Sequence, residues 1–132
     1  MRLIAAVCLV VSTLLAGPTK AAVPIDVTMI QLIANPEKFD GKLIRVIGFL
    51  KLEFEGNVLY LHREDYEYAL SDGIWVDVTL EIKKHSNELN MHYVLLEGVF
   101  NSRDRGHMDM WSGTITKIQR AERWIVPERG KS

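Results

Sequence analysis

The sequence of 132 residues is poor in cysteine, and its only one, Cys8, lies in the first segment of the chain. The rest of the chain therefore has no thiol for a disulfide, a cysteine-based zinc site or a cysteine nucleophile. It also lacks an excess of charge, because 16 Lys and Arg stand against 17 Asp and Glu. No overall field attracts nucleic acid or an anionic membrane. A hydrophobic core must hold the fold together.

Long apolar runs are missing as well. The longest mainly apolar run, residues 3–16, is shorter than the roughly 20 residues that span a bilayer. It follows Arg2 and precedes a helix-breaking Gly-Pro pair and small residues, a pattern typical of a secretory signal peptide. We expect residues 1–21 to be this signal peptide, with an uncleaved membrane anchor as the alternative.

Small residues at Thr19 and Ala21 favour cleavage after Ala21, and Ala16 is a weaker site. Cys8 lies inside the apolar run rather than after it, which disfavours a lipoprotein. We therefore expect a periplasmic or secreted protein with no stable membrane anchor after cleavage.

The remaining chain has the composition of one globular domain. With residues 1–21 removed, 14 basic and 17 acidic side chains give a formal charge of −3. The hydrophobic share of 48% and the charged share of 25% in the whole sequence are close to the globular average, which argues against disorder. We expect one domain over residues 22–126 and a disordered basic tail over residues 127–132.

A short helix is expected to open this domain. Thr28 followed by Gln31 matches a capping box, and Asp26 is a competing N-cap. The pair Asn35-Pro36 ends the helix, because a residue before proline is disfavoured in helical conformation.

Alternating apolar residues predict five strands. The first covers residues 42–54, with Phe54 on its core-facing side and Gly48 as the position where it can bend sharply. A Gly56-Asn57 turn joins it to the second strand. The others are expected over residues 58–62, 74–79, 92–100 and from about 110 to 124; residues 64–70 are expected to form one or two helical turns, and the polar residues 80–90 are weakly helical. Five strands in so short a chain predict a small barrel, because closure removes exposed strand edges.

Several segments of this chain resemble a known family. They are residues 31–42 (QLIANPEKFDGK), 45–50 (RVIGFL), 54–62 (FEGNVLYLH), 106–108 (GHM) and 111–116 (WSGTIT). Over about residues 27–124 the chain is similar to small exported bacterial proteins with an OB-fold related to the anticodon-binding type. The resemblance implies a mainly β, five-stranded OB-fold-like barrel with a short N-terminal helix. It supplies no catalytic motif.

OB-folds bind ligands around their second and third strands and the loops that join strands one to two and four to five. Here the expected four-to-five loop, residues 101–110, is long, charged and ends on Trp111. Arginines in it suit a carboxylate, phosphate or sugar diol, and a tryptophan suits a sugar or base. The alternative is a solvated loop whose tryptophan folds over the barrel end. The candidate ligand-binding residues are Tyr60, His62, Trp75, Asp77, Arg103, Arg105, His107 and Trp111.

Signals for catalysis are weak. The sequence has no Gly-x-Ser-x-Gly elbow, phosphate-binding glycine loop or His-Glu-x-x-His motif. His62 and His107 each have an acid nearby, but this spacing is unspecific for a metal, and we expect no metal and no other cofactor. Acidic residues gather around strands two and three and basic residues late in the chain, which suits a protein or cationic partner on the acidic side, or an ordinary solvated surface.

The expected function is therefore that of a non-catalytic exported binding module for a protein, glycan or small molecule. A metal-dependent hydrolase and a single-stranded nucleic-acid-binding protein are the alternatives. The formal charge of −3 opposes the second of these.

Overall fold

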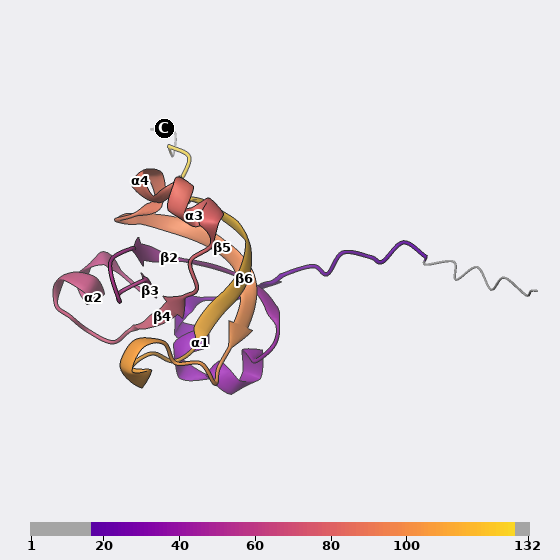
Figure 1. The fold of residues 1–132 in the computed structure, drawn as a ribbon, viewed down its shortest axis with the longest axis horizontal. Coiled ribbons are helices and arrows are strands. Elements are labelled where there is room, and N and C mark those ends of the chain that lie inside the picture. Colours follow the sequence, from indigo (N-terminus) through magenta and orange to yellow (C-terminus); the bar gives the residue numbers. More distant parts are fainter. Residues whose placement is uncertain (1–16, 129–132) are drawn as a thin grey trace, which may run out of the picture.

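The chain forms a closed β-barrel with short helices at its two ends (Figure 1). The structure, a computed structural model, describes residues 17–128, so the expected signal peptide and basic tail lie largely outside it. The elements, in chain order, are β1 (Ile25–Asp26), α1 (Met29–Ala34), η1 (Pro36–Phe39), β2 (Leu43–Lys51), β3 (Val58–Tyr60), α2 (Arg63–Glu67), β4 (Gly73–Val76), α3 (Leu80–Lys84), α4 (Ser86–Leu89), β5 (His92–Asn101), η2 (His107–Asp109) and β6 (Thr114–Arg123).

Five of the strands close the barrel, as the alternating pattern predicts. The order is β2-β3-β4-β6-β5, and β2 also pairs with β5 to complete the ring. All barrel neighbours are antiparallel except β4 and β6, which are parallel. The sixth strand, β1, was not expected; it runs parallel to β2 outside the ring, where Ile25 pairs with Ile44.

The N-terminal helix begins and ends where its capping residues indicate. The Thr28 hydroxyl accepts a hydrogen bond from the Gln31 amide at 3.2 Å, and the Gln31 side chain accepts one from the Thr28 amide at 2.8 Å. Asp26 is not the N-cap, because it belongs to β1. α1 ends before Asn35, as expected, and buries Met29 and Leu32 against the barrel.

The first barrel strand is shorter than predicted, and this changes the environment of Phe54. β2 ends at Lys51, because the next amide, that of Leu52, donates to the Asn90 side chain at 2.8 Å instead of continuing the ladder. The chain turns at residues 54–55, two positions earlier than the Gly-Asn pair suggests. Phe54, expected on the core-facing side, is 91% exposed.

Gly48 allows β3 to lie close over β2. A Cβ atom at Gly48 would come within 2.7 Å of the Leu59 Cγ and 2.8 Å of the Tyr60 carbonyl oxygen. The barrel wall therefore requires glycine at this crossing.

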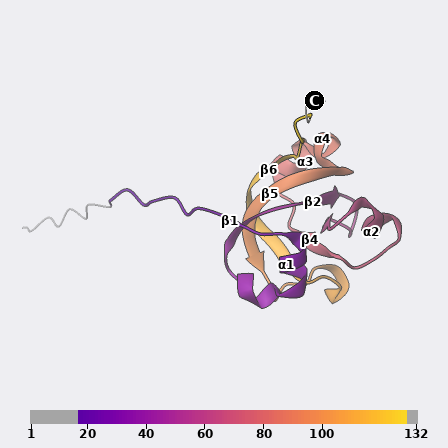
Figure 2. The same cartoon turned by 180° about the vertical axis from the view of Figure 1, so that it is seen from behind.

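The polar connection between β4 and β5 forms two short helices, so its weak helical pattern is confirmed. Thr79 caps α3 by accepting from the Ile82 amide at 3.2 Å. Ile82 of α3 and Leu89 of α4 are buried in the main core. The two helices lie over one end of the barrel (Figure 2).

The last strand begins at Thr114, later than the expected start near residue 110. The residues before it belong to the β5–β6 loop, which contains the short turn η2. The β5–β6 ladder shifts register beside Gly98, where a Cβ atom would lie 2.7 Å from the Thr116 carbonyl oxygen. Glycine at this position therefore accommodates the irregular backbone of β6.

An ionic network ties β1, β2, β5 and β6 together on the outside of the barrel. One oxygen of Glu97 accepts from Arg45 at 2.7 Å and from Arg120 at 3.0 Å. Arg45 also reaches Asp26 at 3.2 Å, and Arg120 also pairs with Glu122. The hydrogen bond from Arg45 is the main reason that the pKa of Glu97 is held below its ordinary value.

Candidate functional site

Two of the predicted ligand-binding residues form a small second core instead. Tyr60 and Trp111 are buried, and their rings meet edge to face with centroids 5.6 Å apart. Phe49 and Val58 complete this cluster, with Trp75 packed against its margin. The arrangement corresponds to the simpler alternative, in which the loop tryptophan folds over the barrel end. Tyr60 and Trp111 therefore pack inside the barrel end and offer little surface to a ligand.

Because Tyr60 is buried, the stability of the barrel is expected to depend on pH in the alkaline range. Burial is the main cause that raises the pKa of Tyr60 to about 12, with a smaller contribution from Glu53. The unfolded chain loses this proton near pH 10, about two units earlier, so stability falls as pH rises through this window, by roughly 2–3 kcal/mol. In urea unfolding between about pH 8 and pH 12, Tyr60→Phe should flatten this fall. Tyr68→Phe, at a position 75% exposed, is the control and should behave like the wild type.

Hydrogen bonds within the β5–β6 loop, residues 102–113, hold it over this second core. The Arg105 side chain donates to the Trp111 carbonyl at 2.8 Å, and the Trp111 amide donates to the Arg105 carbonyl at 3.1 Å. Arg105 also lies 3.5 Å from Asp109. Its guanidinium, predicted to bind an anionic or sugar ligand, is thus engaged in fixing the loop.

Trp75 is enclosed by the same loop. Its ring stacks on His107, with centroids 6.4 Å apart and planes 28° apart. On the chain next to His107, Gly106 has φ of 68°, and a Cβ atom there would lie 2.5 Å from the Trp75 Cγ. Glycine is required here both by the backbone conformation and by the close approach of the indole.

The β2–β3 loop, residues 52–57, meets the β5–β6 loop where His107 approaches Glu55. The His107 imidazole lies 3.7 Å from the Glu55 carboxylate, which places the tips of the two loops side by side. The residues next in sequence, Phe54 and Met108, are 91% and 77% exposed. We call the surface that these loops form the loop-end surface; it consists of Phe54, Glu55, Trp75, His107, Met108 and Met110.

The backbone of the loop-end surface is unusual. Glu55, Met108 and Asp109 have φ between 54° and 58°, the left-handed region that favours glycine. Such conformations cost about 1 kcal/mol or more for residues with a side chain. Met108 adopts this unfavourable conformation although its exposed side chain contributes little to the packing of the barrel. The sequence therefore places an apolar side chain in solvent where glycine would suit the backbone better.

The two loops that form the loop-end surface contain more acids than arginines. The two loops contain four acids and two arginines: Glu53, Glu55, Asp104, Asp109, Arg103 and Arg105. Arg105 is bound within its loop, and Arg103 lies 4.0 Å from Asp40, a residue of the η1–β2 turn. The loops that carry Phe54 and Met108 therefore have an excess of carboxylates.

The other predicted ligand-binding residues do not join this surface. His62 lies at the start of α2, where its imidazole is 3.7 Å from the Asp65 carboxylate. The carboxylate beside His107 is a different one, that of Glu55. Asp77 is exposed just after β4, and its amide donates to the Ile115 carbonyl at 3.0 Å. Sequence reasoning missed Phe54, Met108 and Met110, although the turn residues beside Phe54 were a signal that it is exposed.

No three His, Cys, Asp or Glu within residues 17–128 come together in a way that could hold a metal ion. Over the same residues, no helix has the length and apolar character required to cross a membrane. Comparison of the chain with protein-family models, curated proteins and solved structures finds no match to any of them.

Proposed function

We propose that the chain is a non-catalytic binding module of the OB type that docks a protein partner on its loop-end surface. Its strand order and the parallel pair β4–β6 are those expected of an OB barrel. The loop-end surface is built by the loops between the first and second barrel strands and between the fourth and fifth. These loops flank the face that OB barrels use for ligands.

The exposure of Phe54 and Met108 carries this proposal. Two large apolar side chains stand 91% and 77% exposed on adjoining loop tips. Exposed apolar clusters rimmed by polar residues are typical of protein interaction sites. Methionine suits such a surface, because its flexible side chain adapts to the partner.

The charge and the aromatic geometry favour a protein over the other ligand classes. The excess of carboxylates in these loops opposes a phosphate backbone and suits a segment in which apolar residues are accompanied by Lys or Arg. A sugar would need an open aromatic face, whereas Trp75 is covered by His107 on one side and approached by Gly106. The proposed partner is therefore a polypeptide with apolar and basic side chains.

Capture from envelope extract tests the proposal, since residues 1–21 have the pattern of a signal peptide. The wild type should retain a defined partner, and a Phe54→Ser, Met108→Ser double variant should retain it at least about tenfold less, because burial of apolar area is lost. Ile30→Ser is the matched control, since Ile30 is a 63% exposed apolar residue on α1 and its replacement should leave capture unchanged.

Two results would contradict this function. Equal capture by the wild type and the double variant would remove the loop-end surface from the interaction. Retention on single-stranded DNA that weakens steeply with salt would instead favour nucleic-acid binding.

A further inference from the structure

Three consecutive bulky apolar residues after β6 are exposed. Trp124, Ile125 and Val126 are 44%, 72% and 63% exposed. The Trp124 amide still donates to the Tyr93 carbonyl at 2.9 Å, so the first residue of the run is fixed to the edge of β5. A run of this kind on a soluble domain calls for a functional reason, which is most often contact with another molecule. We call residues 124–126 the apolar segment.

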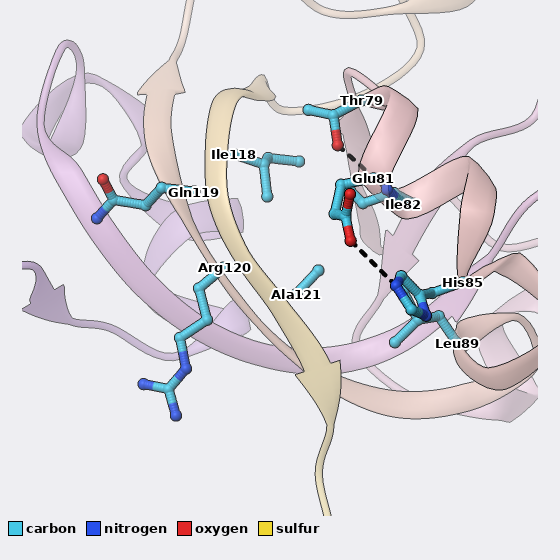
Figure 3. Close-up of a pocket in the computed structure, with 9 residues that line it drawn as sticks. All are labelled: Thr79, Glu81, Ile82, His85, Leu89, Ile118, Gln119, Arg120 and Ala121. Carbon is cyan, nitrogen blue, oxygen red and sulfur yellow. Dashed lines mark hydrogen bonds and ion pairs between the residues drawn. The ribbon is translucent and has the colours of Figure 1, made fainter.

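A hollow lies beside the apolar segment, between the α3–α4 pair and β6. A small cavity of about 60 Å³ adjoins a larger one of about 560 Å³, and the two share four lining residues, Glu81, His85, Leu89 and Ala121. Figure 3 shows Ile118 and Ala121 directed toward the helices, and Arg120 directed away from them. The floor of the hollow is therefore apolar, and Ile125 of the apolar segment lines its larger part.

Charges of both signs line this hollow. On the helix side, His85 lies 3.0 Å from Glu81 and 3.8 Å from Glu88. On the strand side, Glu122 and Arg123 line the larger cavity, and Glu122 pairs with Arg120. One face thus carries an exposed apolar segment, an apolar hollow, and charges of both signs that include Glu88 on the helix side and Arg123 on the strand side.

We propose that this face joins two copies of the chain about a two-fold axis, with the apolar segment of each copy in the hollow of the other. A two-fold interface uses the same patch on both copies, so the patch must be complementary to itself. A protrusion next to a hollow meets this condition, and so do Arg123 and Glu88, which would pair across the axis in both directions. The face lies at the α3–α4 end of the barrel, away from η2 in the loop-end surface (Figure 1).

The oligomeric state of the purified protein tests this. Sedimentation equilibrium should show a dimer for the wild type, and Ile125→Asp should weaken association by at least about tenfold, because it places a charge in an apolar contact. Ile125 is 72% exposed, so the variant should unfold at the same temperature as the wild type when both are monomeric. Phe54→Asp, in the loop-end surface, should remain dimeric and lose partner capture, which separates this proposal from the proposed function.

A charge exchange tests the two-fold arrangement itself. Glu88→Arg and Arg123→Glu should each give a monomer, because like charges then face each other across the axis. A mixture of these two variants should form a heterodimer, since every facing pair again has opposite charges. A monomeric wild type up to high micromolar concentration, a dimeric Ile125→Asp, or a mixture that stays monomeric would overturn the proposal.

Discussion

Replacement of Phe100 by alanine is expected to lower the free energy of unfolding by about 3–5 kcal/mol, because a large cavity would remain in a rigid core. Phe100 is fully buried on β5, where its ring occupies the space over Gly113 that a side chain at that glycine would need. Its amide donates to the Lys42 carbonyl at 3.0 Å, and its carbonyl accepts from the Gly41 amide at 2.8 Å. The ring therefore stands where β2 and β5 meet and close the barrel.

Urea unfolding followed by circular dichroism measures this cost, and the chain offers a matched control. Phe54→Ala removes the same atoms from a side chain that is 91% exposed and should change stability by no more than about 0.5 kcal/mol. Similar losses for the two variants would show that Phe100 does not support the core as described.

Trp111→Ala is expected to have an effect of similar size on stability, about 3–5 kcal/mol, and also to abolish partner capture. The Trp111 ring packs edge to face on Tyr60, and the β5–β6 loop closes over it through Arg105. Without the ring, this loop loses its support, and Met108 no longer has a defined position. This single change therefore affects both the second core and the loop-end surface.

Two further variants separate these effects for Trp111. Trp111→Phe keeps an aromatic contact with Tyr60 and should retain more stability and capture than Trp111→Ala. Trp124→Ala removes an indole that is 44% exposed and should cost much less in urea unfolding of the monomer. Capture that survives Trp111→Ala would show that the loop does not need the second core.

The regular parts of the barrel could be predicted because their sequence patterns are local. In β2, Ile44 and Val46 are buried and alternate with less buried residues. The capping box between Thr28 and Gln31 forms as its spacing indicates. These signals depend on neighbours within a few residues, which a sequence shows directly.

The ends of the strands depend on distant partners and could not be predicted in this way. β2 ends early because the Leu52 amide donates to Asn90, which lies 38 residues further along the chain. β1, with two residues, is too short to show an alternation, and the turn η2 delays the start of β6. Tertiary contacts decide each of these boundaries.

The candidate site was predicted in part. The sequence indicated the β5–β6 loop and Trp75, and the structure brings Trp75, Arg105, His107 and Trp111 together there. The sequence did not indicate that Phe54 is exposed, because an apolar residue that continues an alternating pattern is assigned to the core. Arginine and tryptophan suggested ligand contacts, yet Arg105 and Trp111 both stabilise the loop. Their roles depend on orientation, which composition does not reveal.

Closure of the barrel by β2 and β5 also constrains how this chain folds. Leu43 pairs with Val99 and Leu50 with His92, so the joined segments are 56 and 42 residues apart in sequence. Such long-range pairing carries a large entropic cost of loop closure and slows folding relative to proteins built from local contacts. During synthesis, β2 has no partner along this edge until β5 has left the ribosome. A newly made chain therefore passes through a stage in which one edge of the nine-residue strand β2 is open to pairing with other chains.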